Sequence, residues 1–166
     1  STLSIADQVN HAKSIFPQKP GHARWNLVIS HMKRRKINRN CFDFFVQGQT
    51  LKCRLSDELV GRIYKGCPLI GCANHKNLIN GQFLQVKDWT DVQVILQDIE
   101  SQETLNIAHD DLQFCRLGWS MTYQQSQGRS LKEKTLIHDT SHRFFTSAHL
   151  SLGISRGTDK TLLDLA

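Results

Sequence analysis

The sequence lacks any long apolar run, and this absence bears on where the protein works. No stretch approaches the roughly eighteen apolar residues that cross a bilayer. The start, Ser1-Thr2-Leu3-Ser4, has no basic region followed by an apolar core. The sequence therefore predicts a soluble, intracellular protein without a membrane partner, in the nucleus or the cytoplasm, with host and viral replication sites both open. It also begins without an initiator Met, which predicts that it was cut from a longer polypeptide.

The cysteines are odd in number, which leaves at least one without a disulfide partner in the chain. A chain of 166 residues with five cysteines can build its own apolar core, so reduced and mostly buried thiols are expected. Cys67, Cys72 and His75 have the spacing C-x4-C-x2-H, but no second pair accompanies them. Structural zinc sites use paired spacings, so no metal site is predicted.

Acidic residues are missing from one end of the chain. The formal net charge is +6, with 21 Lys and Arg against 15 Asp and Glu, and no acid occurs from Gln8 to Phe42. Residues 49–112 contain nine acids and six bases, a net charge of −3, so the two flanks together carry +9. A basic surface favours an anionic partner, which we expect on the flanks.

Apolar periodicity also divides the chain. Residues 5–16 have helical spacing before Pro17 and Pro20, and residues 25–29 form a short apolar run before a basic helix through Ile37. Short strand-like runs follow at 67–72, 82–86, 91–96 and 104–108, as in a small antiparallel barrel. After these runs the pattern is again that of an α/β domain, with a strand near 117–123, a strand at 135–138 and a helix over 141–152. We therefore predict an α/β domain made of 1–48 and 113–166, with a β insert at 49–112.

Three polar stretches are candidates for chemistry. In residues 27–38, a strand leads to Ser30, which could cap a basic helix suited to phosphate, although a solvated helix face is the competing interpretation. In residues 122–131, Ser126-Gln127-Gly128 offers a hydroxyl, an amide and a glycine that admits close backbone approach, as would any polar turn. In residues 149–159, Arg156 follows an apolar helix and could stabilise a transferring phosphoryl group, or could cap helix carbonyls.

In this order the stretches resemble the C-terminal half of a superfamily 1 DNA helicase of the RecD/PIF type. The family pattern T-N-x-x-R-x-x-[IL]-N corresponds to Ser30-His31 with Arg34/Arg35 and Ile37-Asn38. Its next segment, G-x-P-V followed by N-G, corresponds to residues 66–70 and to Asn80-Gly81. Its T-x-H-K-[SA]-Q-G corresponds to Ser126-Gln127-Gly128, and its Y-V-A-L-S-R-[AG]-x to residues 150–159.

The resemblance implies a second RecA-like domain, with a parallel sheet and helices, interrupted by a small SH3-like β-barrel. It implies an ATP-driven motor that translocates on single-stranded DNA and unwinds duplexes in DNA replication and repair. If the family's motif residues keep their roles at the matching positions, Arg156 would be the catalytic arginine finger and would bind nucleotide with Gln127 and Gly128. The DNA-binding residues would be Ser30, His31, Arg35, Lys76, Asn77, Tyr123 and Ser126. Lys87 is a further candidate.

The chain departs from the family in ways that limit what it does alone. Gln124-Gln125 replaces the family's His-Lys, and His31 stands where Asn is usual. No G-x-x-x-x-G-K-[ST] loop is present, so ATP and Mg²⁺ would be held mainly by an N-terminal RecA-like domain that this sequence lacks, or by a replication partner. We expect the fragment alone to be inactive. The alternative is a non-catalytic module that binds single-stranded nucleic acid.

Most large aromatic side chains are expected in the core. Trp25 and Trp119 abut predicted strands, so burial is favoured for both. Tyr123 ends a strand beside the Ser-Gln-Gly loop, and it is the best candidate for an exposed ring that stacks on a base. The histidines have no ligand spacing, and His138, His142 and His149 are expected to pack or to form hydrogen bonds.

Overall fold

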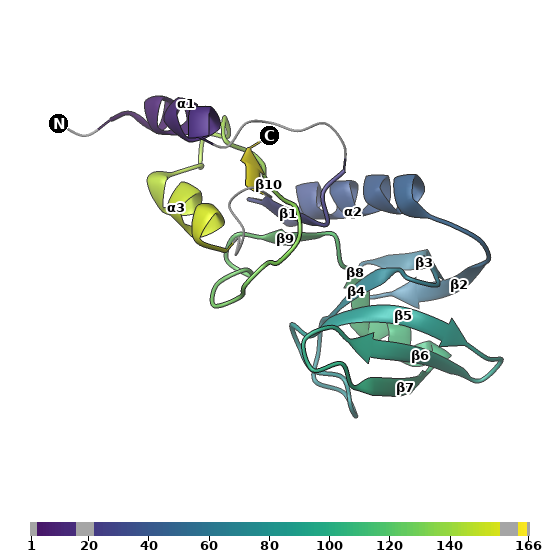
Figure 1. The fold of residues 1–166 in the computed structure, drawn as a ribbon. Helices are drawn as coiled ribbons and strands as arrows, with labels where there is room; N and C mark the ends of the chain where they lie inside the picture. Colours follow the sequence, from purple (N-terminus) through teal and green to yellow (C-terminus); the bar gives the residue numbers. More distant parts are fainter. Residues whose placement is uncertain (1–2, 16–21, 157–162, 166) are drawn as a thin grey trace. The chain divides into compact units, whose positions relative to one another are not determined.

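A computed structural model describes residues 3–15, 22–156 and 163–165. It divides the chain into two compact units, one made of Ser1–Ile37 with Trp119–Ala166 and the other of Asn38–Gly118 (Figure 1). The predicted β insert, residues 49–112, falls within the second unit. Phe16, where the first predicted helix ends, and the following Pro17 and Pro20 lie outside the described residues.

The first unit contains a parallel four-stranded sheet. Its strands are β1 (Trp25–Val28), β9 (Ser120–Thr122), β10 (Thr135–Ile137) and β11 (Leu163–Leu165), in the order β11-β10-β1-β9. Every residue of β1, β9 and β11 is buried, as expected for a sheet covered on its faces. The parallel sheet with its helices confirms the α/β prediction and fits a RecA-like fold.

Two short helices belong to this unit and contact each other, α1 (Ile5–Ile15) and α3 (Ser147–Arg156) (Figure 1). α1 buries Val9 and Ala12, while α3 buries Leu150 and Gly153. A Cβ added at Gly153 would meet Ile137 Cδ1 at 3.0 Å and Tyr123 Cε1 at 3.2 Å. The glycine therefore lets α3 approach β10 closely.

The helix predicted over 141–152 begins later. The chain makes tight turns first, since His142 N donates to Asp139 O and Phe145 N to His142 O, each at 2.9 Å. Thr146 then caps α3, its Oγ1 accepting from His149 N at 3.4 Å. The start of the predicted helix was wrong because Thr146, and not an earlier hydroxyl residue, supplies the cap.

α2 (His31–Phe45) extends beyond the predicted end at Ile37, and the division between the two units falls within it. Ser30 is its cap as predicted, since Lys33 N donates to Ser30 Oγ at 3.2 Å. The helix continues because its buried positions keep one helical face. These positions are Arg34, Asn38, Cys41 and Phe42.

The second unit is antiparallel throughout. A hairpin joins β2 (Thr50–Leu55) to β3 (Glu58–Tyr64). A five-stranded sheet has the order β7-β6-β5-β4-β8. Its strands are β4 (Pro68–Gly71), β5 (Phe83–Trp89), β6 (Gln93–Asp98), β7 (Thr104–Ala108) and β8 (Cys115–Leu117), with the 3₁₀ helix η1 (His109–Phe114) before β8.

The β-rich character of the insert is as predicted, but its barrel is not shown. Within the described chain, the strands of the insert belong to two separate sheets, so the SH3-like assignment stays a prediction. The single strand predicted near 117–123 is two strands, β8 and β9, on either side of Gly118 and Trp119. No helix among the described residues has the length and apolarity that a membrane span needs.

Candidate functional site

The carboxyl ends of three parallel strands bring polar residues to one edge of the first unit's sheet. Ser30 and His31 follow β1, Tyr123 follows β9, and His138 and Asp139 follow β10. Open α/β sheets bind ligands outside the carboxyl ends of their strands. This edge is therefore the candidate functional site.

Asp139 ties two of these strand ends together. Its Oδ2 accepts a hydrogen bond from Ile29 N at 3.0 Å, and its Oδ1 lies 3.4 Å from Lys33 Nζ. The residue has a left-handed backbone, with φ of 64°, a conformation that Asp tolerates better than most side chains. The carboxylate is thus turned toward β1 and the first turn of α2.

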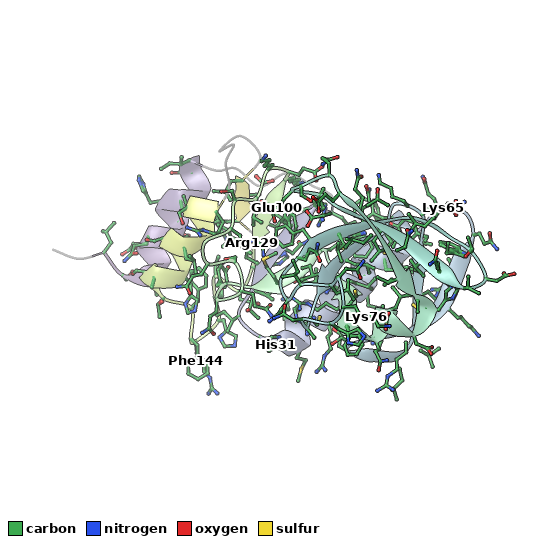
Figure 2. The ribbon with its side chains drawn as sticks, turned by 90° about the horizontal axis from the view of Figure 1, so that it is seen from below. His31, Lys65, Lys76, Glu100, Arg129 and Phe144 are labelled. Carbon is green, nitrogen blue, oxygen red and sulfur yellow. The ribbon has the colours of Figure 1, made fainter. Side chains whose placement is uncertain are left out.

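The start of α2 is basic and open to solvent. Its first turn contains no acid, and Ser30, His31 and Arg35 are all exposed. His31, labelled in Figure 2, accepts a hydrogen bond at Nδ1 from Nε of the buried Arg34, at 3.1 Å. Helix N-terminal amides and nearby cations both attract anions. The DNA role of this turn stays a prediction.

The Ser-Gln-Gly loop turns its three residues in different directions. Ser126 is fully buried and its Oγ donates to Tyr123 O at 2.6 Å, so its hydroxyl closes the turn. Gln127 and Gly128 are exposed, and Gly128 has a φ of 76°. The predicted DNA contact of the Ser126 side chain is corrected, because a buried hydroxyl bonded to its own backbone does not reach a strand outside.

Tyr123 is also buried, against the prediction. Its side chain is 2% exposed, its ring contacts Phe145 and His149 edge-on, and its hydroxyl donates to His138 O at 2.6 Å. Burial raises the pKa of its phenol, so the hydroxyl stays protonated. The predicted base stacking by Tyr123 is corrected because α3 covers the ring at Gly153. Burial of Trp25 and Trp119 is confirmed.

Arg156 ends α3 beside the Ser-Gln-Gly loop. Its Nη1 donates to Ser126 O at 3.4 Å, and its own carbonyl accepts from Leu131 N at 2.8 Å. Its Nε and Nη2 donate to Ser155 Oγ at 3.3 and 3.1 Å. The structure thus brings two of the predicted stretches together, although they are far apart in sequence. Gly157, Thr158 and Asp159 of the motif lie outside the described residues.

A buried network of hydrogen bonds centred on Asn26 links β1 to the residues beside this edge of the sheet. Asn26 Nδ2 donates to Ala23 O at 3.1 Å and to Trp119 O at 3.0 Å, while its Oδ1 lies 2.8 Å from His138 Nε2. Burial and, to a smaller extent, nearby Lys33 lower the pKa of His138 from 6.5 to about 4, while Asp139 opposes the shift. His138 is therefore neutral, and Nε2–H is the donor to Asn26. As predicted, His138 forms hydrogen bonds.

Sequence reasoning missed Asn26, Lys33 and Asp139. One signal was present for Asn26, since an amide inside the apolar run 25–29 needs buried partners. Asp139 gave no such signal, because its role depends on the pairing of β10 with β1.

Lys76 and Asn77 lie on an exposed turn of the second unit. Backbone hydrogen bonds between His75 and Leu78 close the turn, and Lys76 adopts a φ of 53°. Asp111 anchors it, with carboxylate oxygens 3.2 Å from His75 Nε2 and 3.4 Å from Lys76 Nζ. Lys76 therefore presents a partly compensated charge. Lys87 is exposed and donates to Gln85 Oε1 at 2.9 Å.

Comparisons with known proteins give a likeness in fold alone. No protein-family model and no curated protein matches the sequence. The Pif1 helicase from Candida albicans is similar with a TM-score of 0.70 and 13% identity, over 96% of this chain and 49% of that chain. Bacteroides Pif1 bound to ssDNA is similar with a TM-score of 0.69 and 14% identity, over 96% of this chain and 45% of that chain.

A second Bacteroides Pif1 structure, in complex with ADP-AlF3 and ssDNA, has a TM-score of 0.69 and 13% identity, again over 96% of this chain and 45% of that chain. The present chain spans just under half the length of these proteins. The resemblance predicted from the ordered motifs is confirmed at the level of the fold.

Proposed function

We propose that this chain, which folds like just under half of a Pif1 helicase, is the second RecA-like half of an ATP-dependent superfamily 1 DNA helicase. In this role it supplies an arginine finger and part of the single-strand track. The phosphate loop and the magnesium ligands come from another RecA-like domain, because this sequence has no phosphate-loop motif. The fragment alone does not hydrolyse ATP.

One observation carries the proposal, the position of Arg156 against the Ser-Gln-Gly loop. Its guanidinium has five N–H donors, and its contacts with Ser126 and Ser155 use three of them. The remaining donors are available to a phosphate oxygen. The exposed Gln127 amide and Gly128 backbone belong to this same loop. These groups fit the anionic end of a nucleotide, whereas a cation such as Mg²⁺ finds no carboxylate in this loop.

ATP bound across such a site would present its γ-phosphate to this chain. Arg156 would stabilise the negative charge that spreads over the phosphoryl oxygens as water attacks and ADP leaves. Contacts with Ser126 and Ser155 hold the guanidinium in place, so little orientation is lost when the oxyanion arrives.

The proposed single-strand track includes residues of each of the two units. In the first unit it comprises Ser30, His31 and Arg35 at the exposed start of α2, and in the second unit Lys76 and Asn77. Gln125 does not replace the family's cation, because its Oε1 accepts from Thr122 N at 3.1 Å and the side chain turns back to its own loop. Within the first unit, the track therefore relies on α2 for its positive charge.

The test is steady-state ATPase of a longer protein that joins this chain to a phosphate-loop domain. We expect Arg156→Ala to lower turnover by about a thousandfold or more. Arg156→Lys keeps the charge but loses the planar fork, so it should recover only part of the rate. Arg54→Ala, at an exposed position on β2, is the matched control. Near wild-type turnover in Arg156→Ala would remove this residue from the mechanism.

The second candidate function is binding of single strands without hydrolysis. The +9 charge of the flanks, together with the missing phosphate loop, favours it. The chain alone should then bind oligonucleotides with an affinity that falls steeply with salt. A longer protein that binds DNA but shows no DNA-stimulated ATPase would favour this function over the motor.

A further inference from the structure

A groove in the first unit lies between α1 and the turn 140–145. Its volume is about 450 Å³, which is enough for a nucleotide-sized group. Its walls combine the apolar Ile5, Ala6, Val9 and Phe145 with cationic and polar side chains that include Lys13, Asn10, Ser141, His142 and Arg143. Among the described residues that line it there is no carboxylate. A groove of this composition favours an anionic occupant.

The carboxylates nearest in sequence are held by other groups. Asp139 is bonded to Ile29 and lies close to Lys33, and Asp7 accepts from Ser4 Oγ at 2.8 Å. Within the described residues, neither Lys13 nor Arg143 forms an ion pair. Both cations are therefore available to a ligand.

The turn also presents an aromatic ring to solvent. Phe145 is buried against Tyr123 and stacks on His149, which anchors the turn. The adjacent Phe144 is 58% exposed and extends away from the ribbon (Figure 2). Arg143 Cζ lies 4.6 Å from the Phe144 ring centroid, and Phe144 N donates to His142 Nδ1 at 3.1 Å.

An exposed phenylalanine beside a guanidinium is suited to a flat, anionic polymer. Nucleic-acid bases stack on aromatic side chains, and arginine contributes to the same stack while contacting phosphate. An acidic peptide would use the cations but would leave the ring without a matching planar group. The combination favours nucleic acid as the occupant.

We propose that the turn 140–145 and the groove beside α1 bind single-stranded DNA, with a base stacked on Phe144 and phosphates on Arg143 and Lys13. This inference rests on the proposed function, and it adds a contact that the sequence motifs do not include. The contact lies beyond the carboxyl end of β10, next to Asp139. It would lengthen the single-strand track within the first unit.

The test is fluorescence anisotropy of a labelled oligothymidylate with the 166-residue chain. Phe144→Ala should raise the Kd about tenfold, because one stacked base is lost. Phe144→Trp keeps a stacking ring, so its Kd should stay close to the wild-type value and its fluorescence should be quenched by the oligonucleotide. Arg143→Ala and Lys13→Ala should each weaken binding and lower the salt slope by about one.

Two matched controls separate this surface from general effects. Phe44→Ala removes a ring that is 61% exposed in the second unit, and Lys52→Ala removes an exposed cation on β2. Neither should change the Kd. Circular dichroism of each variant checks that the fold is retained.

The outcomes distinguish this inference from the function on which it rests. If the wild-type chain binds and Phe144→Ala binds equally well, the new contact is overturned while the proposed track stands. Displacement of the oligonucleotide by polyglutamate from wild type, but not from Arg143→Ala, would assign the groove to an acidic protein and overturn it as well. If the wild-type chain binds no single strand, both the track and the new contact fail.

Discussion

His138 Nε2 lies 2.8 Å from Asn26 Oδ1, so a side chain that follows β10 is hydrogen-bonded to the middle of β1. The same Asn26 amide donates to the carbonyl of Ala23, which precedes β1, and to that of Trp119, which precedes β9. The imidazole is neutral in this arrangement. Because burial holds its pKa below the usual range, the stability of the first unit depends on pH.

We predict that acid destabilises the chain through His138. The pKa of His138 is lowered from 6.5 to about 4 on folding, so below 6.5 the unfolded state binds more protons than the folded state. Stability from this group is fully present above pH 6.5 and is lost as the pH falls through 4, a loss of about 3 kcal/mol. Urea unfolding at pH 7 and pH 4 should show this loss in wild type and a smaller one in His138→Gln. An equal loss in both would assign the acid sensitivity to other groups.

Asn26→Ala should destabilise the first unit at neutral pH. The substitution leaves two buried carbonyls and the His138 N–H without their partner, which costs about 2–4 kcal/mol. Asn40→Ala changes an exposed residue of α2 and serves as the control. Thermal and urea unfolding of both variants measure the difference. A change below 0.5 kcal/mol for Asn26→Ala would mean that water replaces the lost bonds.

Asp139→Asn should strengthen binding of single-stranded DNA. Asn keeps an oxygen for Ile29 N and tolerates the left-handed backbone, but it releases Lys33 from its carboxylate. Because Lys33 is partly exposed, the lost ion pair should cost less than about 1 kcal/mol of stability. We expect the Kd for an oligonucleotide to fall roughly threefold at low salt, and less at high salt. Unchanged or weaker binding would place the strand away from this edge.

Gly71→Ala should destabilise the turn that carries Lys76 and Asn77. An added Cβ at Gly71 would overlap the backbone carbonyl oxygen of Ile79, which cannot move aside as a flexible side chain can. We expect a loss of about 2–3 kcal/mol. Gly48→Ala is a control for backbone strain alone, since Gly48 has a φ of 72° but open space around it. Hydrogen exchange should show early opening at residues 71–82 in Gly71→Ala only.

The order of motifs along the chain was enough to predict the fold class, but local patterns were less informative in the insert. β1 and β7 follow their apolar runs closely. The β2–β3 hairpin was missed because Lys52 and Arg54 alternate with Cys53 and Leu55, and the strand lacks a continuous apolar run. Half-buried antiparallel strands have this alternation of polar and apolar residues, so the alternation itself is a signal for β2.

The candidate site was predictable only in part. Its residue types were visible, but the burial of Tyr123 and Ser126 was not, because α3 and the tight turn after β9 determine it. The approach of Arg156 to the Ser-Gln-Gly loop likewise depends on the close packing of α3 on β10 at Gly153. Spacing along the chain carries no information about such a contact between elements.

The pairing of β1 with β9 has a consequence for the order in which the protein can form. These strands are direct neighbours, with Asn26 opposite Ser120, yet the whole antiparallel unit lies between them in sequence. On the ribosome, residues 38–118 are complete and contiguous before β9 has been synthesised. Because contacts between distant segments form slowly, the insert can fold first. The parallel sheet then assembles on a nascent chain whose middle is already ordered.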